Sequence, residues 1–249
     1  GGRDQARQTP VVTPGHELPT RPEIDDRALT IGKRDAEAEE RYKNALRSSP
    51  NNPFIRDRLG RLLIREKKID QAVGQYEELK KFSPSNLDFR TKLGLLYLDR
   101  DRFDDAINEF TFVLNADPGN AQARFFLGTA YEEKGAVAEA QEAFRKVPEG
   151  SPTHREAMLH LAMSLGRQKK SDEAIAIVRS LREKSPDDVE LIIFMAGQLE
   201  EAKRYEEALV VATEATGKAP SNPGAWFSLG VVCDKLGKTD RVIEAMEKV

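Results

Sequence analysis

Residues 87–120 read LDFRTKLGLLYLDRDRFDDAINEFTFVLNADPGN, and this stretch of 34 residues decides the fold. Related stretches precede and follow it at the same spacing. A glycine or alanine recurs every 34 residues, at Gly60, Gly94, Gly128, Ala162, Ala196 and Gly230. A fixed period of this length is typical of a stacked-repeat architecture, in which each unit packs against its neighbours.

Other columns keep the same register. A proline recurs at Pro50, Pro84, Pro118, Pro152, Pro186 and Pro220. The small residue twelve positions after the glycine column is Ala72, Ala106, Ala140, Ala174 and Ala208, with Val242 closing the series. These columns divide the chain into repeats 53–86, 87–120, 121–154, 155–188, 189–222 and a truncated 223–249.

Each repeat contains two short amphipathic segments. In residues 87–120, Leu93, Leu96 and Tyr97 share one helical face, and Ala106 and Phe110 share another. The sequence therefore predicts an all-α fold of helix pairs. N-caps are expected for the first helices at Asn52, Asn86, Asn120, Asp188 and Asn222. In the same way, N-caps are expected for the second helices at Asp70, Asp104, Asp172 and Asp240.

The chain resembles the tetratricopeptide repeat (TPR) family, whose pattern is Leu-Gly-x-x-Tyr followed by Ala, Phe and Pro. The second repeat matches it through Leu93-Gly94, Tyr97, Ala106, Phe110 and Pro118. The resemblance covers residues 53–249 and implies a right-handed α-solenoid of helix-turn-helix repeats. It also implies a protein-binding scaffold, in which the first helices line a concave groove.

The residues before the first full repeat form two further segments. Residues 1–22 contain four prolines and few large apolar groups, which indicates a flexible arm or linker. A sharper alternative is that this arm docks in a groove of its own chain or of a second copy. Residues 23–52 are expected to form a degenerate first repeat or N-terminal cap, with a helix over 35–50 and a poor partner helix over 23–34 weakened by Gly32.

Two local features carry further expectations. Pro148 should end the second helix of the third repeat early and change the superhelix twist there. The chain starts with Gly-Gly and stops at Val249 within a second helix, so we expect it to be a fragment or a processed form. Either the natural protein continues past Val249, or a partner such as a second copy covers that end. Both a cytoplasmic and a periplasmic or membrane-tethered location stay open.

Composition and motifs argue against several classes of function. A formal net charge of −3 gives no electrostatic footprint for nucleic acid. The single cysteine, Cys233, lies in an apolar column and is expected in the core. No apolar run approaches the length of a transmembrane helix. No zinc-binding spacing and no Gly-x-Ser-x-Gly elbow occur, so the sequence predicts no metal, no cofactor and no enzymatic activity.

The resemblance to the TPR family implies that inward positions lie six, three and two residues before the glycine column and one, four and five after it. These positions are basic in the first repeats, apolar and aromatic in the middle, and acidic in the fifth. The predicted peptide-binding residues are Arg58, Arg61, Arg65, Lys92, Leu95, Phe125, Phe126, Thr129, His160, Met163 and Phe194.

Two known TPR site types do not fit this sequence. The positions of the chaperone-tail clamp hold Asp57, Arg61, Lys92, Gln122 and Phe126, so the clamp is absent. The asparagine ladder of sugar-transferase arrays is absent too. The sequence thus predicts a scaffold that binds a peptide or a helix in the groove. The alternative is a substrate-recruiting or assembly arm of a larger enzyme or export complex, with the chemistry in other domains.

Overall fold

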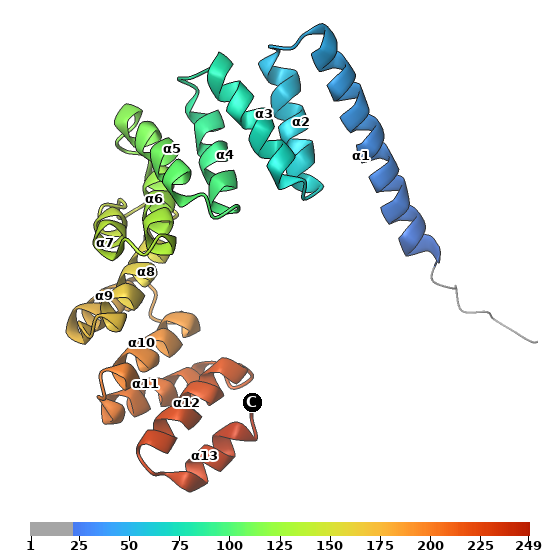
Figure 1. Ribbon diagram of the computed structural model, residues 1–249. Coiled ribbons are helices and arrows are strands. Elements are labelled where there is room, and N and C mark those ends of the chain that lie inside the picture. Colours follow the sequence, from blue (N-terminus) through green and yellow to red (C-terminus); the bar gives the residue numbers. More distant parts are fainter. Residues whose placement is uncertain (1–21) are drawn as a thin grey trace, which may run out of the picture.

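The computed structural model describes the backbone of residues 22–249 and the side chains from residue 34 onward. The predicted N-terminal arm therefore lies almost wholly outside the described residues. Within the described range the chain forms thirteen α-helices and no strand. Figure 1 shows the helices following one another along a curved path, so the predicted all-α solenoid is confirmed.

One long helix precedes six helix pairs. The long helix is α1 (Pro22–Ser48). The first helices of the pairs are α2 (Pro53–Arg65), α4 (Leu87–Leu98), α6 (Ala121–Glu133), α8 (His154–Arg167), α10 (Val189–Glu201) and α12 (Pro223–Lys235). The second helices are α3 (Ile69–Phe82), α5 (Phe103–Ala116), α7 (Val137–Arg145), α9 (Ser171–Lys184), α11 (Tyr205–Lys218) and α13 (Thr239–Met246).

The N-caps of the first helices are as predicted. Each cap side chain accepts a hydrogen bond from the backbone N–H three residues later and so satisfies a donor that the helix leaves free. The caps with this bond are Asn52, Asn86, Asn120, Asp188 and Asn222. In α8 the cap position holds Thr153, which makes no such side-chain bond.

The predicted aspartate caps of the second helices are wrong. The chain turns between the two helices of a pair through one residue in the left-handed region, such as Lys67 at φ 59°. The next N–H then bonds back to the first helix, as Lys68 does to the Leu63 carbonyl at 2.8 Å. This turn makes Lys68 the cap of α3 and places Asp70 inside the first helical turn.

The aspartates placed in this first turn have another role. The positive end of the helix dipole favours a carboxylate there. Three of the four also pair with a basic residue in the corresponding turn of the next repeat. These pairs are Asp70 with Arg100, Asp104 with Lys134, and Asp172 with Arg204.

The glycine column marks the closest approach of the two helices in a pair. A Cβ atom added to Gly94 would lie 2.8 Å from the Phe110 ring, and one added to Gly128 would lie 2.6 Å from the Phe144 ring. Phe110 and Phe144 are fully buried. Glycine is therefore required at these positions because the facing aromatic ring fills the space that a methyl group would occupy.

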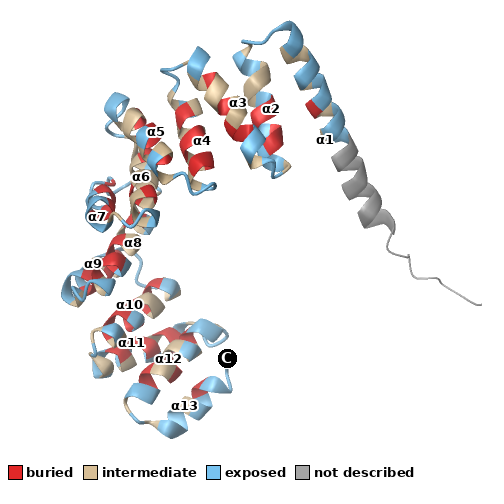
Figure 2. Cartoon of the chain, in the orientation of Figure 1, coloured by how far each residue is buried: buried red, intermediate tan, exposed pale blue. Residues whose placement is uncertain are grey.

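Contacts between repeats define the inner side of the curve. Neighbouring first helices touch each other from α4 through α6, α8 and α10 to α12. Within residues 22–249 the backbones of the second helices approach first helices but not one another, and long side chains bridge neighbouring second helices, as Arg182 of α9 does to Glu214 of α11 at 2.8 Å. Elements on the inside of a curved stack lie closer together, so the first helices line the concave side. We call their exposed face the inner wall. Figure 2 shows the buried residues in red within the helix pairs and exposed residues at the turns.

The prediction of a separate partner helix over 23–34 is wrong. Residues 22–48 form one continuous helix, α1, because residues 23–48 contain no proline and are rich in helix formers. Glu39 of α1 binds Lys68 at 2.6 Å, and Tyr42 and Leu46 pack against the core of the first repeats. These contacts join α1 to the stack, which is consistent with the proposal that it caps this end.

The early end of the third repeat's second helix is confirmed. The helix α7 has 9 residues, whereas α3, α5, α9 and α11 have 14 each. The chain leaves the helix at Lys146 and runs through Pro148 and Gly150 to α8. The expected change in superhelix twist at this point stays a prediction.

The close packing at the glycine column leads to a stability prediction. Gly94→Ala should destabilise the fold by about 1–3 kcal/mol. The added methyl group overpacks against Phe110, and the free-energy cost of this overpacking exceeds the gain in helix propensity. Gly74→Ala is the matched control, since Gly74 lies in α3 with no atom within 4 Å of an added Cβ. It should be neutral or stabilise by up to about 1 kcal/mol. Urea unfolding followed by circular dichroism measures both. A Gly94→Ala variant as stable as the parent chain would contradict the argument.

Candidate functional site

The inner wall is built from residues that meet between neighbouring first helices. An inward residue three positions before a glycine-column residue contacts a residue on the next first helix. That second residue is 35 positions later in the sequence and lies two positions before the next glycine-column residue. Asp57 contacts Lys92 in this way, and Phe125 contacts His160. Ile193 and Ser228 line one cavity. The inward positions of successive repeats therefore lie side by side in the structure.

Asp57 organises the N-terminal part of the inner wall. It accepts hydrogen bonds from Tyr76 at 2.9 Å, from Arg61 at 2.7 Å and from Lys92 at 3.3 Å. Burial works to raise the pKa of Asp57, but these hydrogen bonds and the charge of Lys92 outweigh burial and lower the pKa below its ordinary value. Burial and the bond to Asp57 raise the pKa of Tyr76.

The predicted basic region is consequently less positive than its sequence suggests. Arg61 and Lys92 share Asp57, Lys92 also pairs with Asp88, and Arg65 pairs with Asp35 of α1. Arg58 forms no ion pair among the described side chains, and its guanidinium lies 5.1 Å from the centre of the Phe54 ring. A ligand in this region would meet one free cation and three that are already paired.

The three predicted arginines are brought together in one cavity. A space of about 250 Å³ between α1 and α2 is lined by Ala38, Tyr42, Arg58, Arg61, Leu62 and Arg65. The cavity is polar, and α1 forms one of its walls.

The predicted aromatic residues also come together. The ring centres of Phe125 and Phe126 are 5.3 Å apart, and the Phe125 ring lies 5.8 Å from His160 in an edge-on arrangement. Each phenylalanine also contacts a buried ring beneath it: Phe125 contacts Phe144 at 6.0 Å and Phe126 contacts Phe110 at 5.8 Å. Both are half-buried, so they pack in the core as well as facing the inner wall.

The remaining predicted residues differ in exposure. His160 bonds through Nδ1 to Glu132 at 2.6 Å, and the Thr129 hydroxyl donates to the Phe125 carbonyl at 3.2 Å. Leu95 and Phe194 are half-buried and pack against the core, each in its own half of the molecule. Met163 is 38% exposed, which leaves it free to contact a ligand.

The structure adds an apolar pocket that the sequence prediction missed. We call it the C-terminal pocket, and it has a volume of about 320 Å³ between α10 and α12. It is lined by Ile193, Ala196, Gly197, Glu200, Gly224, Phe227, Ser228, Val231 and Val232. The inward-position rule, applied to the sixth repeat, gives Gly224, Phe227, Ser228, Val231, Asp234 and Lys235, so extending the rule to the last repeat would have found four of the nine lining residues.

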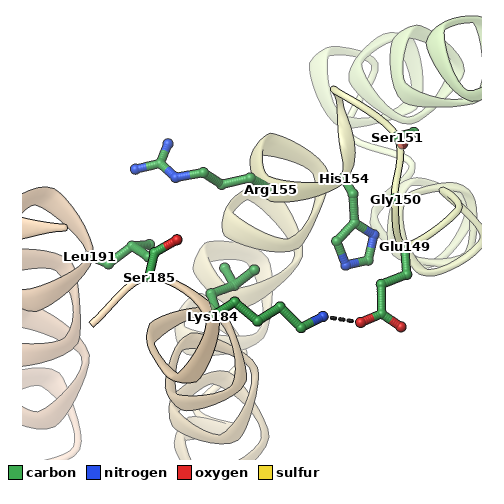
Figure 3. Close-up of a pocket in the computed structure, with 9 residues that line it drawn as sticks. Glu149, Gly150, Ser151, His154, Arg155, Lys184, Ser185 and Leu191 are labelled. Atoms are coloured by element: carbon green, nitrogen blue, oxygen red, sulfur yellow. Dashed lines mark hydrogen bonds and ion pairs between the residues drawn. The ribbon is translucent and has the colours of Figure 1, made fainter. Parts of the chain in front are cut away.

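A larger cavity of about 440 Å³ lies away from the inner wall, beside the loop that follows the short α7 (Figure 3). Its charged groups already have partners. Lys184 pairs with Glu149, Arg155 pairs with Asp188 at 3.0 Å, and His154 bonds through Nδ1 to the Val147 carbonyl at 3.1 Å. The loop that replaces the missing helical turns forms one side of this space, so the short α7 accounts for it.

Three other kinds of feature bear on function in the described residues: metal-binding clusters, membrane-spanning helices and the cysteine. No group of three or more His, Cys, Asp or Glu side chains between residues 34 and 249 is placed to hold a metal ion. None of the helices in the described part of the chain is both long and apolar enough to cross a bilayer. Cys233 is buried, as predicted.

Comparisons with known proteins agree with the repeat pattern. One tetratricopeptide repeat model matches residues 91–155, and a second matches residues 156–188. No curated protein matches the sequence.

Several solved structures are similar to this fold. A tetratricopeptide repeat protein from Parabacteroides merdae is 19% identical, with a TM-score of 0.64 over 90% of this chain and 89% of that one. YrrB, described as a TPR protein with an unusual peptide-binding site, is 18% identical, with a TM-score of 0.59 over 75% and 96%. PilW, described as a type IV pilus biogenesis factor, is 18% identical, with a TM-score of 0.62 over 78% and 90%.

The lowered pKa of Asp57 predicts a pH-dependent contribution to stability. A carboxylate whose folded pKa is depressed stabilises the fold above its unfolded pKa, about 3.9, and this contribution is lost as the pH falls through the folded value. The difference in unfolding free energy between the parent chain and Asp57→Asn should therefore be positive near neutral pH and shrink below about pH 4.

Urea unfolding at a series of pH values measures this difference. The control is Asp70→Asn, which removes an exposed partner of Arg100 and should change the unfolding free energy by less than about 0.5 kcal/mol at neutral pH. A constant difference for Asp57→Asn from neutral to acid pH would count against the proposed role of its charge.

Proposed function

The chain belongs to the tetratricopeptide repeat family, and from this premise we propose that its inner wall binds a polypeptide segment of another protein. Repeats of this family serve as scaffolds for protein interaction. The resemblance to YrrB, which is described as having a peptide-binding site, supports a peptide as the ligand.

The observation that carries this proposal is the exposed apolar surface on the first helices. Phe54 of α2 is 66% exposed, Met163 of α8 is 38% exposed and Phe227 of α12 is 56% exposed. All three occupy inward positions. Large apolar side chains that stay exposed on a concave surface are typical anchors for a partner.

The spread of these residues favours a ligand that crosses several repeats. They lie in the first, fourth and sixth repeats, so a short ligand cannot reach all of them. An extended segment rises about 3.3 Å per residue and can follow the wall while its backbone stays accessible to polar side chains. A helix that lays one apolar face on the wall would use the same anchors.

The proposal predicts different effects for inner and outer substitutions. The double variant Met163→Asp with Phe227→Asp should lose most peptide binding, because two anchors become charged. Val210→Asp should keep it, because Val210 is 70% exposed on the second helix α11, away from the inner wall. A library of random twelve-residue peptides displayed on phage, panned against each intact variant, measures the effect.

Circular dichroism checks that all variants keep their helical content. The proposal is contradicted if no peptide is enriched on the parent chain. It is also contradicted if the enriched peptides bind the inner double variant as well as they bind the parent.

A further inference from the structure

We propose that the C-terminal pocket takes one apolar side chain of a partner peptide that carries Lys or Arg two or three residues away. This inference rests on the proposed function and names the chemistry of its ligand. The shape of the pocket, the charges at its end and the distance between the two favour this ligand.

The pocket is open because glycine occupies inward positions in it. A Cβ atom added to Gly197 would have no neighbour within 4 Å, so no other residue that the structure describes fills that space. Gly224 lies opposite, where an added Cβ would meet only Ile193 and its own cap residue within 4 Å. Ile193, Val231 and the exposed ring of Phe227 make the walls apolar. A space of this kind accepts an aliphatic or small aromatic side chain.

One end of the pocket carries unpaired negative charge. Glu200 lines the pocket and Glu201 follows it, and neither forms an ion pair with any side chain described between residues 34 and 249. Two inner-wall carboxylates nearer the N-terminus do have partners: Asp57 pairs with Arg61, and Glu132 binds His160. No described cation lies within ion-pair distance of these two carboxylates, and Lys235, which holds the position 35 residues after Glu200 on α12, forms no ion pair with either.

The position of these carboxylates strengthens the argument. Glu200 and Glu201 lie in the last turn of α10, where the helix dipole is negative and where α10 carries no basic residue. A carboxylate at that end is unfavourable for the helix itself. A cation supplied by a ligand would interact favourably with both carboxylates and with the dipole.

The geometry sets the spacing in the ligand. Ile193, Gly197 and Glu200 follow one face of α10, so the apolar part and the carboxylate are between one and two helical turns apart, about 5–10 Å. An extended peptide covers that distance in about two or three residues. Apolar and basic residues at this spacing would fill the pocket and neutralise Glu200 together.

The test starts from the phage library panned on the intact chain. Enriched peptides are sorted by whether their binding survives Phe227→Asp. The peptides that lose binding should contain an aliphatic or aromatic residue with Lys or Arg two or three positions away. Their affinity, measured by fluorescence anisotropy with synthetic copies, should fall by about 3- to 10-fold on Glu200→Gln and weaken with added salt.

Glu133→Gln is the matched control. Glu133 likewise forms no ion pair with a described side chain and lies in the last turn of an inner-wall helix, α6, but it stands two repeats before α10. It should leave the affinity of these peptides unchanged. Glu200→Gln should also leave the unfolding midpoint unchanged or raise it, which separates a binding role from a structural one.

Three outcomes would overturn the inference. The first is that no enriched peptide depends on Phe227. The second is that the dependent peptides lack basic residues or are insensitive to Glu200→Gln. The third is concentration-dependent dimerisation of the free chain that Phe227→Asp abolishes, which would assign the pocket to a second copy. The first outcome would leave the proposed function standing if the enriched peptides bind through Met163 instead.

Discussion

The contact between the glycine column and the residue 16 positions later sets the distance between the helices of each pair. The first three repeats pair Gly with a large ring, as Gly94 does with Phe110. The fourth and fifth repeats instead pair Ala162 with Val178, and Ala196 with Ala212. Each of these pairs is small on at least one side, because both residues are buried where the two helices meet. A larger residue on the small side would therefore overpack the contact.

This constraint determines which residues are free to bind a ligand. The second helices and the buried face of the first helices supply the core. Asparagine caps and the aspartates of the turns satisfy the helix ends and link neighbouring repeats. What remains is the inner wall, where helices hold the side chains in place and some large apolar ones, such as Met163 and Phe227, stay exposed. A binding surface built in this way is preorganised, because the helices do not need to order when a ligand arrives.

Sequence periodicity predicts most of the fold, since the same contacts recur every 34 residues. It fails where two residues 30 or more positions apart decide the outcome. The basic region illustrates this: Arg65 is partly neutralised by Asp35 and Lys92 by Asp57, and these two pairs depend on how neighbouring helices meet. The predicted aspartate caps are wrong for a local reason. The turn between the two helices of a pair is so compact that the second helix begins one residue before the aspartate, as α3 begins at Ile69 before Asp70. The C-terminal pocket was missed only because the inward rule stopped at the fifth repeat.

The aromatic cluster shows why sequence alone cannot separate anchors from core. The buried core has two parts, one in residues 59–130 and the other in residues 140–245. Phe126 packs against the first part, Phe125 packs against the second, and the two rings touch each other. An alanine at either position would therefore weaken the joint between the two halves as well as any ligand contact. Loss of binding in such a variant does not identify an anchor, whereas loss at Met163 or Phe227 does, because more than a third of each side chain is exposed in the free chain.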